Sequence, residues 1–127
     1  MIATLSAIAA GGALGALARY GVNIGAGKLL GHGFPYGTLC VNVAGSLIMG
    51  VIIAGFAQIW QPPESLRVLI VTGFLGAFTT FSTFSLDVAT LWERSDYTAT
   101  AVYLIASVTL SIAALFGGIA LVRMVPS

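Results

Sequence analysis

Four apolar stretches, each of about twenty residues, follow one another along the chain with short polar turns between them. Only 7% of the 127 residues are charged, whereas 58% are hydrophobic. Soluble domains carry about 25% charged residues, so the sequence indicates an integral membrane protein. We expect one transmembrane domain, residues 1–127, with spans at about residues 2–20, 37–60, 66–92 and 97–122.

The charge, cysteine and histidine content excludes several classes of function. A net charge of +1 without a basic cluster argues against nucleic-acid binding. Cys40 is the single cysteine, which excludes an internal disulfide, and we expect its thiol to be buried in the membrane. His32 is the single histidine and is expected to be a solvated loop residue rather than a metal ligand. No nucleophile–base pair is present, so the sequence does not indicate an enzyme.

The first span carries a face of small residues that lets another helix approach closely. These residues are Gly11, Gly12, Gly15 and Ala16. The N-terminus lacks the positive region of a signal peptide, so we expect this span to be retained. We expect it to end at the membrane interface with Arg19 and Tyr20, and the Gly-rich residues 21–35 to form a loop or a short interfacial helix.

The third span contains the sequence GFLGAFTTFSTFS at residues 73–85. Glycine, threonine and serine are uncommon in a membrane span unless their backbone or hydroxyl groups are used. The tripeptide TFS occurs twice in succession, so equivalent residues are three apart and share a helix face. The length of the span predicts two half-helices with an interruption between Gly76 and Thr79. Such a break frees carbonyl groups that need a donor or a cation.

Polar residues on the other spans complete a candidate ion path. Asn42, in the second span, needs a partner for its amide, and an interhelical hydrogen bond and a pore role are equally open. Asp87 lies near the end of the third span, where we expect a vestibule or hydrogen-bonding role. In the fourth span, Tyr103, Ser107 and Ser111 are spaced by four and place three hydroxyl groups in one line.

These groups together favour a small anion. The amide of Asn42, the hydroxyl groups and the positive ring edges of Phe81 and Phe84 can replace part of an anion's hydration shell. The hydroxyl groups are those of Ser107, Ser111, Thr83 and either Ser82 or Ser85. We expect no charged side chain at mid-span: a cation there would bind an anion too tightly, and an acid would suit a proton-coupled or cation exporter.

The positive charges flanking the spans are evenly divided. Arg19, Lys28 and Arg94 are expected on one side of the membrane, with the N-terminal amine, Arg67 and Arg123 on the other. The positive-inside rule then sets no orientation, so the chain can insert both ways. Two inverted copies can pair about a two-fold axis in the membrane plane. Their helix breaks could meet on that axis and present a ring of carbonyls suited to sodium.

Residues 73–85, the sequence GTLCVNVAGS at residues 37–46, and Arg19 closely resemble the Fluc/CrcB family of fluoride channels. The resemblance covers essentially the whole chain. It implies an all-α, dual-topology homodimer of four-helix subunits in the cell membrane, with two antiparallel pores that export fluoride passively. The pore residues that it implies are Asn42, Phe81, Ser82, Thr83, Phe84, Tyr103, Ser107 and Ser111. It also implies a central structural sodium ion held by the backbone carbonyls of Gly76 and Thr79. Ala77 stands where many members have a second glycine, which could stiffen the break.

Two other classes of function remain open from the residues alone. A small dual-topology drug or cation antiporter has a similar length, but it requires a membrane-embedded carboxylate in the first span, and residues 2–18 contain none. A non-transporting helix bundle is the other class. Packing alone does not require the line of hydroxyl groups on the fourth span.

Overall fold

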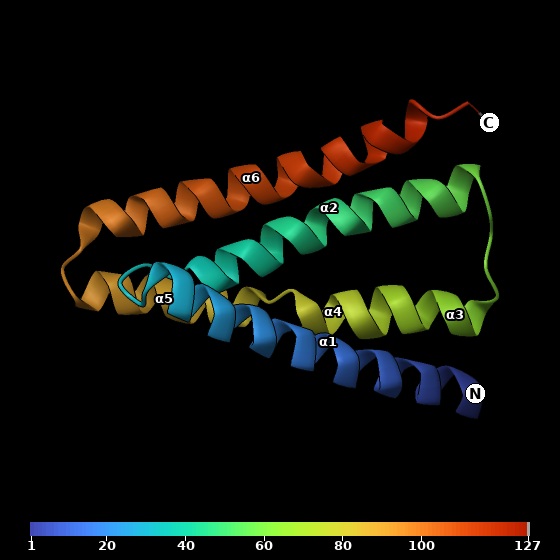
Figure 1. The fold of residues 1–127 in the computed structure, drawn as a ribbon, viewed down its shortest axis with the longest axis horizontal. Coiled ribbons are helices and arrows are strands. Elements are labelled where there is room, and N and C mark those ends of the chain that lie inside the picture. The colour runs from blue at the N-terminus through green and yellow to red at the C-terminus, as the bar shows by residue number, and fades with distance from the viewer. Residues whose placement is uncertain (127) are drawn as a thin grey trace.

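Four long helical segments run side by side and form the whole molecule (Figure 1). The computed structural model describes residues 1–126, and no strand occurs within that range. Three of the segments are single helices: α1 (Ile2–Leu30), α2 (Tyr36–Gln58) and α6 (Tyr97–Arg123). The remaining crossing consists of α3 (Glu64–Val68), a π-helical segment η1 (Leu69–Leu75), α4 (Gly76–Phe78) and α5 (Phe81–Glu93). All four crossings are long and apolar enough to span a membrane, which confirms the predicted all-α class.

The first helix is longer than the sequence predicted. α1 continues past Tyr20 to Leu30, so only residues 31–35 connect it to α2. Gly31 ends the helix with a positive φ of 86°, and its N–H donates to the Gly27 carbonyl at 3.1 Å. The prediction of a loop or short helix over residues 21–35 is therefore wrong for most of its length. A continuous helix pairs these backbone groups, which an irregular segment beside lipid would leave unpaired.

Two residues near this connection test other predictions. His32 is exposed in the loop, as expected. Cys40 is exposed on the surface of α2, a helix apolar enough to span a membrane, so its thiol faces away from the other helices of the subunit.

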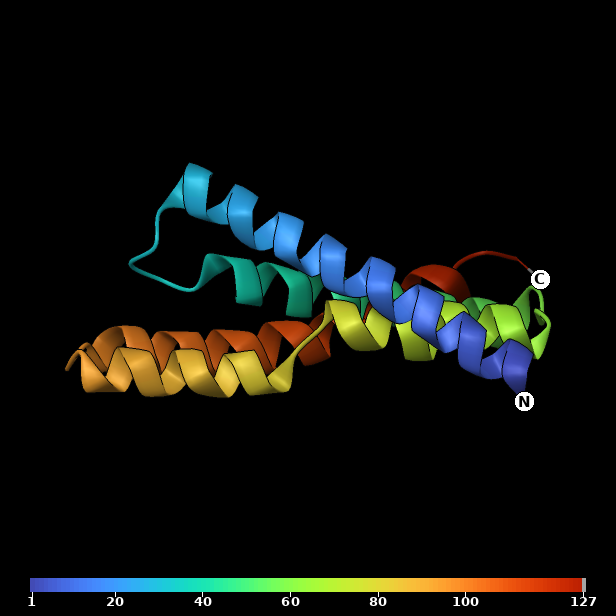
Figure 2. The same cartoon turned by 90° about the horizontal axis from the view of Figure 1, so that it is seen from below.

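The third crossing is broken near its middle, as predicted, but the break is at Thr79–Thr80. Both residues have extended backbones, with φ and ψ of −87° and 158° at Thr79 and −155° and 122° at Thr80. Gly76, where the interruption was expected to begin, is helical. The crossing also contains the wider π turn of η1, which the sequence did not predict. The break sets α5 aside from the line of α3 and α4, so that α5 lies along α6 (Figure 2).

Glycines allow the helices to pack backbone against backbone. A Cβ atom at Gly11 or Gly15 of α1 would overlap a carbonyl oxygen of η1, at Leu69 or Phe74 respectively. The small-residue face predicted on the first span is thus confirmed at these two positions. α2 and α6 meet in the same way, because a Cβ at Gly50 would overlap the Leu115 carbonyl. Close backbone contact is a main source of helix association within lipid.

Substitution of Gly50 tests the close packing of α2 on α6. We expect Gly50→Ala to lower the free energy of unfolding by about 1 to 3 kcal/mol, because the added methyl group forces the two backbones apart. Gly55 lies on the same helix with open space around it, so Gly55→Ala is the matched control and should not destabilise the protein. Unfolding in detergent, followed by circular dichroism, measures both variants. Equal stability of the two would contradict the close contact.

Candidate functional site

Side chains from α1 and α2 hold the backbone at the helix break. The Asn42 amide makes two bonds to Thr80: its Nδ2 donates to the Thr80 carbonyl at 3.0 Å, and its Oδ1 accepts from the Thr80 N–H at 2.8 Å. From the other side, Arg19 Nε donates to the Ala77 carbonyl at 3.0 Å. These bonds replace helical hydrogen bonds that the break removes. The partner of Asn42 is therefore an interhelical backbone, which was one of the two open alternatives.

Arg19 lies deeper than predicted. Because α1 runs on to Leu30, Arg19 is within the helix and beside the break rather than at the end of the span. The expectation that no charged residue lies at mid-span is therefore wrong. The guanidinium group sits at the C-terminal end of α4, where unpaired carbonyls carry partial negative charge. A charge in this position is stabilised by the broken helix itself.

A cavity of about 410 Å³ lies beside the break, and we call it the break cavity. It brings together predicted pore residues from α2, α5 and α6. Its lining includes Asn42, Thr80, Phe81, Phe84, Ser107 and Ser111.

Two hydroxyl groups in the break cavity have no hydrogen-bond partner within residues 1–126. The side-chain oxygens of Ser107 and Ser111 are buried and unpaired. Other hydroxyls in the spans bond back to their own helix, as Ser85 does to the Phe81 carbonyl at 3.0 Å and Thr90 to the Leu86 carbonyl at 2.9 Å. An unpaired buried hydroxyl costs about 1 to 3 kcal/mol. The two serines therefore indicate a site for a hydrogen-bonding ligand.

Phe81 and Phe84 lie against each other at the edge of the break cavity. Their ring centroids are 5.4 Å apart, with the planes inclined at 52°. Phe84 is buried against Tyr103, whereas Phe81 is 76% exposed. An aromatic ring presents positive potential at its edge, so these rings can add to the donor groups around an anion.

Three other predicted pore residues do not line the break cavity. The Tyr103 side chain is fully buried, and its hydroxyl donates to Asp87 Oδ2 at 2.9 Å, which confirms a hydrogen-bonding role for Asp87. Ser82 is exposed, with its hydroxyl 3.4 Å from that of Thr80. Thr83 lines a different cavity.

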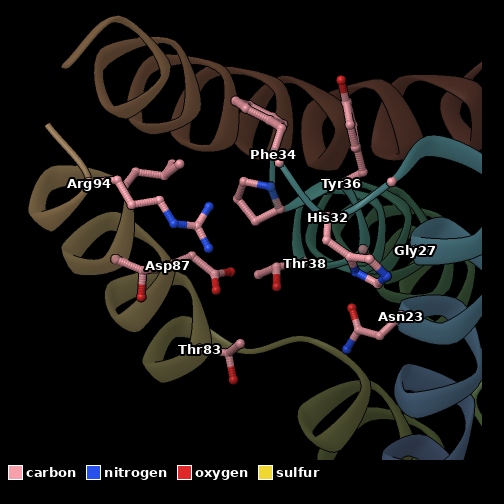
Figure 3. Close-up of a pocket in the computed structure, with 15 residues that line it drawn as sticks. Asn23, Gly27, His32, Phe34, Tyr36, Thr38, Thr83, Asp87 and Arg94 are labelled. Atoms are coloured by element: carbon pink, nitrogen blue, oxygen red, sulfur yellow. The ribbon is translucent and has the colours of Figure 1, made fainter. Parts of the chain in front are cut away.

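This second cavity, of about 300 Å³, lies between α5 and the α1–α2 connection, and we call it the mouth cavity (Figure 3). Its polar lining includes Asn23, Thr38, Thr83, Asp87 and Arg94. The side chains of Thr38, Asp87 and Arg94 point into the same space (Figure 3). The sequence did not predict Asn23 or Thr38 as site residues. Thr38 precedes Asn42 by one helical turn, so this spacing could have placed the two on one stripe.

The sodium ligands that the sequence predicted are backbone oxygens beside the break, the carbonyls of Gly76 and Thr79. Residues 1–126 contain no group of three or more His, Cys, Asp or Glu side chains that could bind one. The carbonyls of Gly76 and Thr79 accept no hydrogen bond from this part of the chain, while that of Ala77 is taken by Arg19. Unpaired carbonyls of this kind suit a hard cation such as sodium.

A discontinuous membrane helix beside a cavity that contains hydroxyl and amide groups is typical of channels and transporters. The family described as "CrcB-like protein, Camphor Resistance (CrcB)" matches residues 6–119. A protein of Nitrobacter winogradskyi named fluoride-specific ion channel FluC is 52% identical over 119 residues, 94% of each chain. A protein of the same name from Rhodospirillum centenum is 52% identical over 117 residues, 92% of this chain and 93% of its own. The chain therefore belongs to the CrcB family, and the predicted resemblance is confirmed.

Substitution of Asn42 tests its role at the break. We expect Asn42→Ala to lower the free energy of unfolding by about 1 to 3 kcal/mol, because both polar groups of the Thr80 backbone lose their partner. Ser46 lines the same cavity from the same helix, and its hydroxyl group makes no hydrogen bond within residues 1–126, so Ser46→Ala is the control. Thermal unfolding in detergent compares the two variants. An Asn42→Ala protein as stable as the control would show that the amide does not hold the break.

Proposed function

We propose that this chain forms a fluoride-selective channel, through which fluoride leaves the cell passively across the membrane and its toxic accumulation is prevented. The observation that carries the proposal is the pair of unpaired hydroxyl groups, Ser107 and Ser111, buried in a cavity that also contains Asn42 and the two phenylalanine rings. Relatives about half identical to this chain, and matched over most of their length, bear the name fluoride-specific ion channel.

For fluoride to cross the protein, hydrogen-bond donors of the protein must replace the water molecules that surround the ion. Fluoride is small and accepts strong hydrogen bonds, so it crosses an apolar layer only if donors replace its hydration shell. Hydroxyl groups and aromatic edges do this without a fixed charge that would hold the ion too long. The proposed pore residues are Asn42, Phe81, Ser82, Thr83, Phe84, Tyr103, Ser107 and Ser111. In this arrangement Tyr103 donates to Asp87, so its hydroxyl must turn before it can serve an ion.

The functional unit that we propose is an antiparallel homodimer with two pores. Phe81 lines the break cavity and is 76% exposed, which suits coverage of this face by a second copy. Both termini and the α2–α3 connection lie at one end of the molecule, and the other two connections lie at the opposite end (Figure 1). Arg19 lies at the break and is no longer counted at either end. The positive groups at one end are then Lys28 and Arg94, and those at the other are Arg67, Arg123 and the N-terminal amine. This near balance still supports insertion in both orientations.

At the centre of that dimer we propose a structural sodium ion, held by the carbonyls of Gly76 and Thr79. Both carbonyls are unpaired within residues 1–126, and inverted copies meeting at their breaks would double the number of oxygen ligands. The positive charge of a bound sodium ion would attract the carbonyl oxygens of both breaks and so hold the two subunits together. A ligand that binds only the folded dimer raises its stability, so we expect a higher melting temperature in sodium than in N-methylglucamine at equal ionic strength. Equal melting temperatures would argue against the ion.

A small cation antiporter is less well supported. α1 contains no carboxylate between Ile2 and Leu30, and Asp87 lies at the mouth cavity, where it accepts a hydrogen bond from Tyr103.

Efflux from liposomes tests the proposed function. Liposomes that contain the purified protein should release fluoride much faster than chloride, with no gradient of protons or sodium, because the pore donors suit a small anion and need no coupling ion. Ion-selective electrodes follow both anions, and empty liposomes are the control. Equal fluoride and chloride rates, or fluoride release only when another ion gradient is present, would refute the channel.

A further inference from the structure

A series of aromatic rings joins the α1–α2 connection to the break cavity. Phe34, in the connection, meets the Tyr103 ring of α6 edge to face, with the centroids 5.5 Å apart and the planes at 87°. The Tyr103 ring meets that of Phe84 in α5 at 5.1 Å, and Phe84 meets Phe81 at 5.4 Å. Phe81 and Phe84 line the break cavity. Ring contacts therefore run without interruption from a loop to the cavity.

Tyr103 is the fixed member of this series. Its side chain has no exposed surface, and its hydroxyl donates to Asp87 Oδ2 at 2.9 Å. Phe84, Leu91 and Tyr103 form one buried cluster, and Phe34 packs against that cluster. Side chains in a close-packed cluster do not move independently of one another. A displacement of the Tyr103 ring would therefore also displace the ring of Phe84.

Phe34 is held inward although it lies outside the break cavity. Pro35 restricts the backbone of the residue before it, and the Phe34 carbonyl accepts from the Tyr36 N–H at 2.8 Å. The Phe34 side chain lies at the mouth cavity and is only partly exposed (Figure 3). Two other aromatic residues at this end of the molecule, Trp92 and Tyr97, are more than half exposed. The inward position of Phe34 thus distinguishes it from rings that face the membrane boundary.

We infer that Phe34 is a positioning residue for the Phe84 ring and acts through Tyr103. This inference rests on the proposed channel function. An aromatic ring attracts an anion only at its edge, so the contribution of Phe84 depends on how the ring is turned. The α1–α2 connection then affects fluoride conduction without contacting the ion.

Substitution of Phe34 tests this role. Phe34→Leu keeps an apolar side chain but removes the ring, so Tyr103 and Phe84 gain freedom to turn. We expect the fluoride flux from liposomes to fall about threefold to tenfold. Phe34→Tyr keeps the ring contact and should retain the wild-type flux. A fall of less than twofold in Phe34→Leu, or an equal fall in both variants, would overturn the inference.

A matched substitution separates this effect from the loss of any ring contact. Tyr97 lies on α6, as Tyr103 does, and its ring meets that of Trp92 with the centroids 4.7 Å apart. This pair has no ring contact with the series that begins at Phe34. Tyr97→Leu should therefore retain the wild-type flux. A loss as large as that of Phe34→Leu would contradict a specific role for Phe34.

Fluorine NMR reports the position of the Phe84 ring directly. With 4-fluorophenylalanine at position 84, Phe34→Leu should shift the resonance of this label, because the neighbouring Tyr103 ring moves. Tyr97→Leu should leave the resonance in place. A fall in flux without a shift of the resonance would show that Phe34 does not act through Phe84, and would overturn the inference.

Replacement of Phe34 by pentafluorophenylalanine decides the question if Phe34→Leu does not fold or if the other measurements disagree. The substituted ring keeps its shape but has the opposite quadrupole, so the edge-to-face contact with Tyr103 becomes repulsive whichever ring presents its edge. A fall in fluoride flux of about twofold or more supports the inference, and a smaller change overturns it. A wild-type protein that releases no fluoride would instead refute the proposed function.

Discussion

The interruption of one membrane helix at Thr79–Thr80 is the constraint on which the rest of this structure depends. In lipid, backbone groups freed by such a break must be satisfied within the protein. Asn42 pairs both polar groups of the Thr80 backbone, and Arg19 pairs the Ala77 carbonyl. These bonds fix the start of α5, and therefore the position of Phe81 beside the break cavity. The same residues thus pair the broken backbone and position the lining of the break cavity.

The glycines of α1 and α2 make this arrangement possible. Gly11 and Gly15 bring α1 against the backbone of η1, which places Arg19, one turn further along, within reach of α4. Gly45 of α2 is packed against Thr79, where a Cβ atom would overlap the threonine methyl group, and Asn42 precedes it by less than one turn. Close helix packing in a membrane is usually attributed to stability alone. Here it also determines which polar side chains meet the broken backbone.

The sequence predicted those features that depend on local composition. The scarcity of charge indicated four spans, and the Gly, Thr and Ser residues of 73–85 indicated a broken helix. Asn42 indicated either an interhelical partner or a pore role. The extension of α1 to Leu30 was missed because its Gly-rich end has the composition of a loop, and the depth of Arg19 was missed with it. The break begins later than expected because Asn42 pairs Thr80, a tertiary contact that no local pattern shows. The spacing of four placed Tyr103 in one line with Ser107 and Ser111. The Tyr103 hydroxyl instead bonds Asp87 and lies outside the break cavity, which is again a tertiary contact that no local spacing shows.

The central claim is that the unpaired hydroxyls of Ser107 and Ser111 serve a permeating anion rather than the fold. The most direct measurement compares fluoride flux and melting temperature in the double variant Ser107→Ala, Ser111→Ala, with Thr109→Ala, an exposed hydroxyl of the same helix, as the control. We predict a fall in flux of about tenfold or more with an unchanged or raised melting temperature, because no protein hydrogen bond is lost. Wild-type flux in the double variant would contradict the account.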